Sequence, residues 1–192
     1  MIPTLPAAPP RRGGPFTRAL GRAALRALGW TIAGEFPDEP KLVVITAPHR
    51  SNWDFIVGLA TKFAMGLDAS FLAKHTLFRW PFGAVFRFWG GIPVRRGTAA
   101  HTVAAVVAEF ASREKLVLAL APEGTRKPGT AWKTGFWHIA YAAGVPILPA
   151  VLDRERRVVR FLPVIIPHDM DRDIRALKAE YDSLVPGSVE SR

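Results

Sequence analysis

The sequence contains no cysteine among its 192 residues. Disulfide bonds, thiolate nucleophiles, iron–sulfur clusters and cysteine-ligated zinc are therefore excluded. No uninterrupted apolar run approaches the length of about 18–20 residues that crosses a bilayer, so no transmembrane helix is predicted. The opening residues, MIPTLPAAPPRRGG, contain four prolines and no long apolar core, unlike a secretory signal. We therefore expect a cytoplasmic protein.

Acidic residues are scarce relative to basic ones. The chain has 26 Lys and Arg against 16 Asp and Glu, which gives a formal net charge of +10. Such a charge suits nucleic acid, an anionic membrane surface or an anionic small substrate. It equally suits a basic surface with no ligand, and the charge alone does not choose among these interpretations.

The composition favours one folded domain. Apolar residues make up 49% of the chain, enough to bury a substantial core at this length. Residues 1–15 are rich in Pro, Gly and Arg and are predicted to be flexible. Residues 16–192 contain no internal repeat and no linker, and are predicted to form a single domain.

The first predicted helix covers residues 16–30 and is short and amphipathic. Arg18, Arg22 and Arg26 recur every four residues along one side. Such a helix either packs on the core as a surface helix or lies at a membrane interface, with its arginines toward lipid headgroups. The apolar residues that gather on another side are Phe16, Leu20, Ala23, Ala27 and Leu28, with Trp30 at the end.

Short apolar runs and helical periods alternate along the rest of the chain. The strands are predicted at 42–46, 70–73, 92–94, 116–120, 147–152 and 158–162. The helices are predicted at 51–67, 98–112, 135–143 and 170–184, and the aromatic stretch 78–89 is predicted to be core. Because most strands are apolar throughout, the predicted fold is α/β, with a mixed, mostly parallel sheet covered by helices.

Polar residues follow the strand at 42–46, where ligand sites tend to lie in an open α/β sheet. His49 and Asp54 are separated by four residues, so a turn into a helix can fold the carboxylate back onto the imidazole. A carboxylate on one ring nitrogen fixes the tautomer and leaves the other nitrogen free as a base. Ser51 and Asp54 also fit a capping box that needs no catalysis. The two interpretations are compatible.

A second polar string follows the strand at 116–120. Gly124 permits a tight loop whose N–H groups can point at an anion, and Arg126 offers a fork of donors suited to phosphate. Glu123 can pair with an arginine or accept a hydrogen bond from a substrate hydroxyl. The alternative interpretation is an exposed charged turn.

Four segments, taken in order, resemble the glycerolipid acyltransferase family, best known for the 1-acyl-glycerol-3-phosphate (lysophosphatidic acid) acyltransferases. The family blocks are His-x4-Asp, a Gly-rich apolar stretch ending in Arg, Glu-Gly-Thr-Arg, and an apolar segment with proline. Here they read His49–Asp54, GGIPVRR up to Arg96, Glu123–Arg126, and VPILPA with Pro146 and Pro149. The Ala73-Lys74 step also resembles a family segment, and the motif core spans 42–152.

The resemblance implies a glycerol-3-phosphate acyltransferase-like fold and direct acyl transfer, with His49 as general base and Asp54 orienting it. Arg96 and Arg126 would bind the acceptor phosphate. The acceptor would be a lysophospholipid, above all lysophosphatidic acid, and the donor acyl-CoA or acyl-carrier protein. No metal and no bound cofactor are implied. The other residues assigned to substrate binding are Lys74, Arg95, Glu123, Gly124 and Thr125.

The resemblance also implies a peripheral enzyme at the cytoplasmic face of an anionic membrane, held by the amphipathic helix and by general charge. Under the same resemblance the aromatic stretch 78–89 could also line an acyl-chain tunnel or touch the bilayer. Three alternatives stay open: another lysolipid or hydroxylated lipid as acceptor, a non-catalytic basic module that binds membrane, and a hydrolase that uses the His–Asp pair on water. No nucleic-acid partner is expected, because the aromatic residues sit among apolar residues rather than between Lys and Arg.

Overall fold

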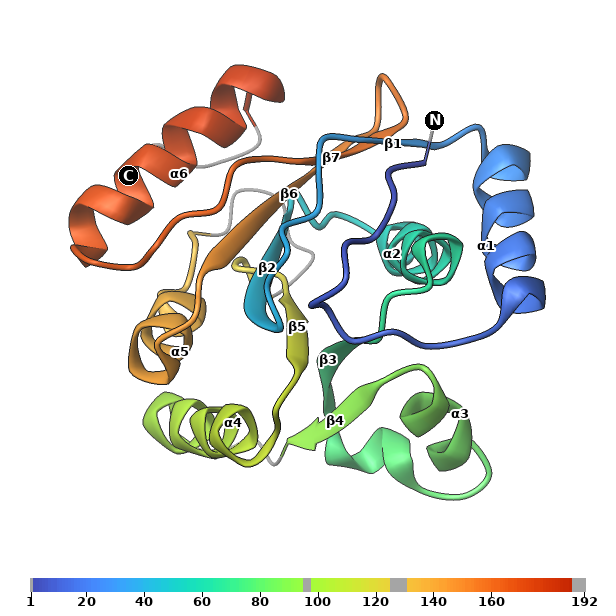
Figure 1. Ribbon diagram of the computed structural model, residues 1–192. Helices are drawn as coiled ribbons and strands as arrows, with labels where there is room; N and C mark the ends of the chain where they lie inside the picture. The colour runs from blue at the N-terminus through green and yellow to red at the C-terminus, as the bar shows by residue number, and fades with distance from the viewer. Residues whose placement is uncertain (1, 95–97, 125–130, 188–192) are drawn as a thin grey trace.

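The computed structural model describes residues 2–94, 98–124 and 131–187. Its centre is a seven-stranded sheet in the order β1-β7-β6-β2-β5-β3-β4 (Figure 1). Neighbouring strands run parallel except β6 and β7, which are antiparallel. The predicted mostly parallel α/β fold is confirmed. The strands are β1 (Thr31–Ala33), β2 (Lys41–Ala47), β3 (Ala69–Lys74), β4 (Gly91–Val94), β5 (Leu116–Leu120), β6 (Ile147–Asp153) and β7 (Val158–Phe161).

Helices cover both faces of the sheet, with α1 and α2 on one side and α4, α5 and α6 on the other (Figure 1). No helix in the described part of the chain is long and apolar enough to cross a bilayer. The helices are α1 (Pro15–Leu28), α2 (Asn52–Met65), the 3₁₀ turn η1 (His75–Phe78), α3 (Gly83–Phe88), α4 (Ala99–Ser112), α5 (Gly135–Ala143) and α6 (Met170–Leu184).

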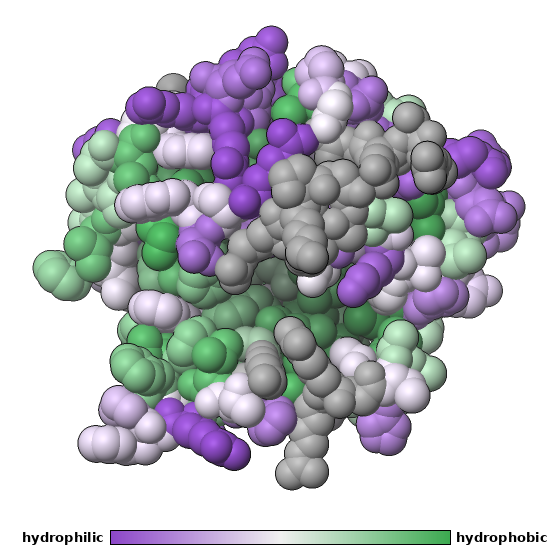
Figure 2. All heavy atoms as spheres, turned by 180° about the vertical axis from the view of Figure 1, so that it is seen from behind, coloured by the Kyte–Doolittle hydropathy of each residue, from purple (hydrophilic) through white to green (hydrophobic). Residues whose placement is uncertain are grey.

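The aromatic stretch 78–89 is not core, so this prediction was wrong. Trp80 is 94% exposed, and Phe82 and Phe88 are also exposed. The segment that connects β3 to β4 runs along the outside of the sheet through η1 and the six-residue helix α3. These two elements are too short to bury all the aromatic rings of the segment. Figure 2, the view from behind, shows hydrophobic surface on the left, the side that carries α1 and α3.

Helix α1 packs on α2 mainly through residues outside its predicted apolar stripe, although Leu28 of that stripe also packs against the buried cluster. Gly21 and Leu25 are buried there, and a side-chain carbon at Gly21 would collide with the α2 backbone at Ala64. This close approach explains why glycine stands inside a helix, where it costs about 0.5–1 kcal/mol relative to alanine. Phe16 and Leu20 from the stripe point to solvent instead.

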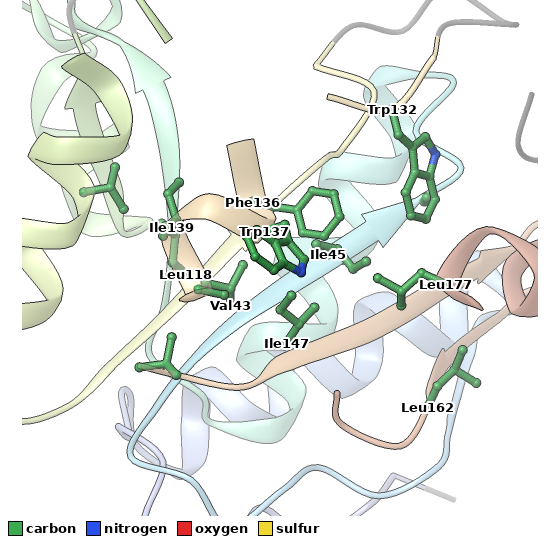
Figure 3. Packing of buried hydrophobic residues seen from close by; sticks show 14 of the residues in the cluster. Val43, Ile45, Leu118, Trp132, Phe136, Trp137, Ile139, Ile147, Leu162 and Leu177 are labelled. Atoms are coloured by element: carbon green, nitrogen blue, oxygen red, sulfur yellow. The ribbon is translucent and has the colours of Figure 1, made fainter. Parts of the chain in front are cut away.

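The sheet is buried on both faces because successive side chains of a strand alternate. In β2, Leu42 and Val44 join the cluster under α1 and α2, whereas Val43 and Ile45 join the cluster under α4 to α6. Figure 3 shows part of this second cluster, in which Ile45 and Val43 lie among side chains of α5 and β6. Continuous apolar strands therefore signalled a covered sheet, as predicted.

The segment before α1, predicted to be flexible, has contacts with the rest of the domain in this structure. Leu5 is buried in the cluster beneath α1 and α2. The backbone N–H of Arg12 donates to the Gly66 carbonyl at 3.0 Å, and the Asp68 N–H donates to the Pro10 carbonyl at 2.9 Å. These contacts place the segment across the carboxyl end of α2.

Candidate active site

The carboxyl ends of three neighbouring strands meet at one edge of the sheet, where α/β proteins place ligand sites. The central strand of the three, β2, has β6 on one side and β5 on the other. His49 follows the end of β2, Glu123 follows β5, and Arg154 follows β6 directly. Segments up to about a hundred residues apart are thereby brought together, and Arg154 and Asp54 are bonded over that separation.

The start of α2 is held by a capping box, as the spacing of Ser51 and Asp54 predicts. The Ser51 hydroxyl accepts from the Trp53 N–H at 3.0 Å. The Asp54 carboxylate oxygen Oδ2 accepts from the N–H of Ser51 at 2.8 Å and of Arg50 at 2.7 Å. The first turn of a helix leaves N–H groups without partners, and the Ser51 hydroxyl satisfies that of Trp53.

The same carboxylate also faces the histidine. His49 Nδ1 lies 3.4 Å from Asp54 Oδ2, and the exposed fraction is 19% for the His49 side chain and 2% for that of Asp54. The two interpretations of Asp54, helix cap and partner of the imidazole, therefore hold at once. With Nδ1 turned to the carboxylate, Nε2 is the nitrogen available to a substrate.

Arg154 is a residue that the sequence did not single out. Its Nη2 lies 2.7 Å from Asp54 Oδ1 and 2.8 Å from Oδ2, and its Nε lies 3.1 Å from Oδ1. Burial raises the pKa of Asp54, but hydrogen bonds from His49, the Ser51 N–H and Arg154 outweigh it and lower the pKa to about 2. Asp54 is thus a buried carboxylate that is ionised at neutral pH.

Glu123 lies beneath the main chain of His49. Both of its carboxylate oxygens accept from the His49 N–H, at 3.1 and 3.2 Å, and the residue is buried. Burial raises the pKa of Glu123, and the hydrogen bond from the His49 backbone opposes this. Gly124 follows with φ of 62°, in the left-handed region that glycine tolerates. The contact seen here supports the histidine loop, a role that the sequence did not indicate.

The residues predicted to bind phosphate are outside the part of the chain that can be described. Arg95, Arg96, Thr125 and Arg126 fall between the described ranges. Lys74 ends β3, at the same edge of the sheet as the histidine, but its side chain is among the parts not described. Their assignment to the substrate stays a prediction. Among the described residues, no three His, Asp or Glu side chains are grouped to hold a metal ion.

Comparison with known proteins identifies relatives of one kind. A family model described as Acyltransferase matches residues 31–153. A 1-acyl-sn-glycerol-3-phosphate acyltransferase of Salmonella typhimurium is 33% identical over 165 residues, covering 76% of this chain and 66% of the relative. Its namesake in Escherichia coli K12 is 34% identical over 112 residues, covering 55% of this chain and 44% of the relative. The matches thus span less than two thirds of these relatives' lengths.

A solved structure shares the fold. The crystal structure of the 1-acyl-sn-glycerophosphate (LPA) acyltransferase PlsC from Thermotoga maritima matches with a TM-score of 0.64 and 17% sequence identity. The match covers 89% of this chain and 79% of that chain. At this identity the likeness establishes the arrangement of strands and helices.

Proposed function

The chain belongs to the acyltransferase family, and from this premise we propose that it moves a fatty acyl group from a thioester donor to a lysophospholipid hydroxyl. The proposed acceptor is lysophosphatidic acid, which becomes phosphatidic acid. The proposed donor is acyl-CoA or acyl-carrier protein. The names of the relatives from Salmonella typhimurium and Escherichia coli, both 1-acyl-sn-glycerol-3-phosphate acyltransferases, support this acceptor.

The observation that carries the proposal is the His49–Asp54 contact of 3.4 Å at the carboxyl edge of the sheet. The imidazole is partly exposed, so a substrate can reach it, whereas the carboxylate behind it is buried and ionised. A base held by a buried carboxylate is suited to taking a proton from a hydroxyl group. Glu123 adds support, because it fixes the main chain of the base.

In the proposed reaction, His49 Nε2 accepts the proton of the acceptor hydroxyl while its oxygen attacks the thioester carbonyl carbon. A carbon–oxygen bond forms, the carbon–sulfur bond breaks, and the proton passes from the imidazolium to the departing sulfur. Asp54 orients the ring through Nδ1 and stabilises its positive form. The transfer is direct and needs no protein nucleophile, which agrees with a chain that contains no cysteine.

The acceptor phosphate would be held by Arg96 and Arg126, with Arg95, Lys74, Gly124 and Thr125 beside them. Charge-assisted arginine–phosphate bonds are strong and directional, which suits recognition of a phosphate headgroup. This proposal is supported by Glu123, the first residue of the Glu-Gly-Thr-Arg motif, because its carboxylate accepts from the His49 N–H.

We further propose that the enzyme is peripheral, resting on an anionic bilayer at the cytoplasmic face. Helix α1 exposes Phe16 and Leu20 on the side turned away from α2, and Arg22 and Arg26 are exposed on the same helix. Aromatic rings at the acyl boundary and arginines at the headgroups are typical of interfacial helices. The exposed aromatic side chains around α3 add apolar surface on the side of the molecule that carries α1 (Figures 1 and 2).

The test is an acyl-transfer assay with both donors and a panel of lysolipid acceptors, read by mass spectrometry of the lipid products. We expect phosphatidic acid from lysophosphatidic acid, and a loss of about 10²–10⁴-fold in His49→Ala. His101→Ala, on the exposed side of α4, is the matched control and keeps full activity. Release of free fatty acid with no acylated lipid, or an active His49→Ala protein that folds normally, would overturn the proposal.

A further inference from the structure

The Asp54 carboxylate has more hydrogen-bond donors than its role toward the histidine requires. Oδ1 accepts twice from Arg154, and Oδ2 accepts from Arg154 and from the N–H groups of Arg50 and Ser51. These contacts lie between 2.7 and 3.1 Å, whereas His49 Nδ1 lies at 3.4 Å. The guanidinium is therefore the nearest charged partner of the carboxylate, and the imidazole is the more distant one.

Arg154 approaches Asp54 as a planar fork from another part of the fold. It follows β6 directly, at the start of the turn into β7, and comes 100 residues after Asp54. The other arginines of this turn bond elsewhere: Arg156 pairs with Asp153, and Arg157 donates to the Leu28 carbonyl. Only the bidentate pair with Asp54 fixes both the position and the plane of a carboxylate.

We propose that Arg154 is a positioning residue of this acyltransferase: it locks the Asp54 carboxylate in place and shares its negative charge, so that Asp54 orients His49 without binding its proton too tightly. This inference rests on the proposed function of His49 as the base. Arg154 touches neither donor nor acceptor in this role. It acts on the reaction through Asp54.

The direction of the effect follows from the charged groups around the His49 ring. Among the described residues these include Asp54 on α2, Glu123 after β5, Arg154 after β6, the adjacent Arg50, and Lys133, whose ammonium lies beside Gly124. The two carboxylates favour a protonated ring and the cationic side chains oppose it. Loss of the Arg154 charge leaves Asp54 balanced only by backbone N–H groups and the ring itself. The ring then holds its proton up to a higher pH.

The experiment compares Arg154→Gln and Arg154→Lys with Arg156→Gln, a matched control in the same turn. We expect the acidic limb of the kcat/KM profile to move up by about 0.5–1 pH unit in Arg154→Gln, so the loss at pH 6 exceeds the loss at pH 8.5. Arg154→Lys keeps the charge without the fork, so its limb moves less while kcat still falls. Arg156→Gln leaves the profile unchanged.

A second readout does not depend on activity. The His49 ring is followed by NMR in histidine-labelled protein and assigned with His49→Ala; its titration midpoint should move with the acidic limb. An unchanged midpoint in a folded Arg154→Gln protein overturns the inference, as does a raised acceptor KM with an unmoved limb, which would make Arg154 a substrate ligand. If Arg154→Gln does not fold, Arg154→Lys decides through kcat: an unchanged kcat in a folded Arg154→Lys protein overturns the inference. If the wild type transfers no acyl group but the midpoint moves, the proposed function fails and the coupling of Arg154 to His49 stands.

Discussion

The two ends of α2 each bury a charged side chain, with opposite consequences. Asp54 in the first turn and Lys62 in the last turn are 4% and 5% exposed. The pKa of Asp54 is lowered to about 2, and the pKa of Lys62 is lowered to about 8. For the carboxylate this shift favours the charged form, whereas for the ammonium it disfavours the charged form.

The partners of each group explain the difference. Against the effect of burial, the pKa of Asp54 is lowered by hydrogen bonds from His49, from backbone N–H groups and from the guanidinium of Arg154. Lys62 donates to the carbonyls of Ala69 and Trp89 and lies 3.6 Å from Asp68, whose carboxylate also pairs with Arg12. Burial is the largest cause at Lys62, where Asp68 favours the charge and Arg12 opposes it.

The fold gives the buried charge of Asp54 a close counter-ion, whereas that of Lys62 has a more distant one. At the end of α2 near the histidine, the ion pair is complete and the carboxylate stays ionised. At the other end the Lys62 ammonium joins three segments by hydrogen bonds. It connects α2 to Ala69 at the start of β3 and to Trp89 just before β4. The helix dipole favours both charges, so it does not account for the contrast.

The largest expected effect is a difference in kcat between variants at the two ends of α2. Under the proposed mechanism, Asp54→Asn removes the charge that orients His49 and should lower kcat by about 10²–10⁴-fold. Lys62→Met leaves the site untouched and should keep kcat within about twofold, because its contacts lie at the opposite end of the helix. The assay is steady-state acyl transfer with matched protein concentrations. Similar losses of kcat in both variants would show that the two buried charges differ in their effect on folding and not in their effect on catalysis.

The second effect is a difference in how stability depends on pH. The folded-state pKa of Asp54 lies below its ordinary value of 3.8, so its contribution of about 2 kcal/mol is present above pH 4 and is lost as pH falls through 2. The pKa of Lys62 is lowered from 10.5 to about 8, so stability rises by about 3 kcal/mol as pH increases from 8 to 10.5.

Urea unfolding at a series of pH values measures both contributions. The difference between wild type and Asp54→Asn isolates the acidic window, and the difference between wild type and Lys62→Met isolates the alkaline one. A Lys62 difference that stays flat between pH 7 and 10.5 would contradict the interpretation of a charge with an incomplete counter-ion.

The smallest expected effect concerns the two caps of α2. Ser51→Ala removes the acceptor of the Trp53 N–H, and Gly66→Ala places a side chain at φ of 71°. Each should lower the free energy of unfolding by about 1 kcal/mol. Ser51→Ala alone should also lower kcat, by a few fold, because Ser51 is two residues from His49. Thermal unfolding and the assay, run on both variants, separate stability from activity. An equal loss of kcat in Gly66→Ala would contradict this.

Local patterns predicted most of the fold. The buried strands β2, β5 and β6 have apolar centres, and the helices α4, α5 and α6 begin and end within about one residue of their predicted bounds. The strand β1 was missed because its three residues contain one buried side chain, Ile32, which gives no periodicity. Exposure of Trp80 was missed because composition does not reveal whether anything covers an aromatic ring.

In the site, too, contacts within one short segment were predicted and contacts between distant segments were not. His49, Ser51 and Asp54 lie within one turn and its helix, so their spacing alone predicted their contacts. The pairs that join distant segments, Arg154 with Asp54 and Glu123 with the His49 N–H, depend on how β5 and β6 flank β2. A basic run at 154–157 gives no sign of which arginine turns inward. The sequence likewise does not show that Lys62 is buried, because a single lysine in an apolar helix is more often exposed.

Gly21 fixes how closely α1 approaches α2. It lets α1 press against the backbone of α2, and α2 begins with the aspartate that faces the histidine. Under the proposed placement of α1 on a bilayer, this close helix packing would fix the distance between the lipid plane and the histidine.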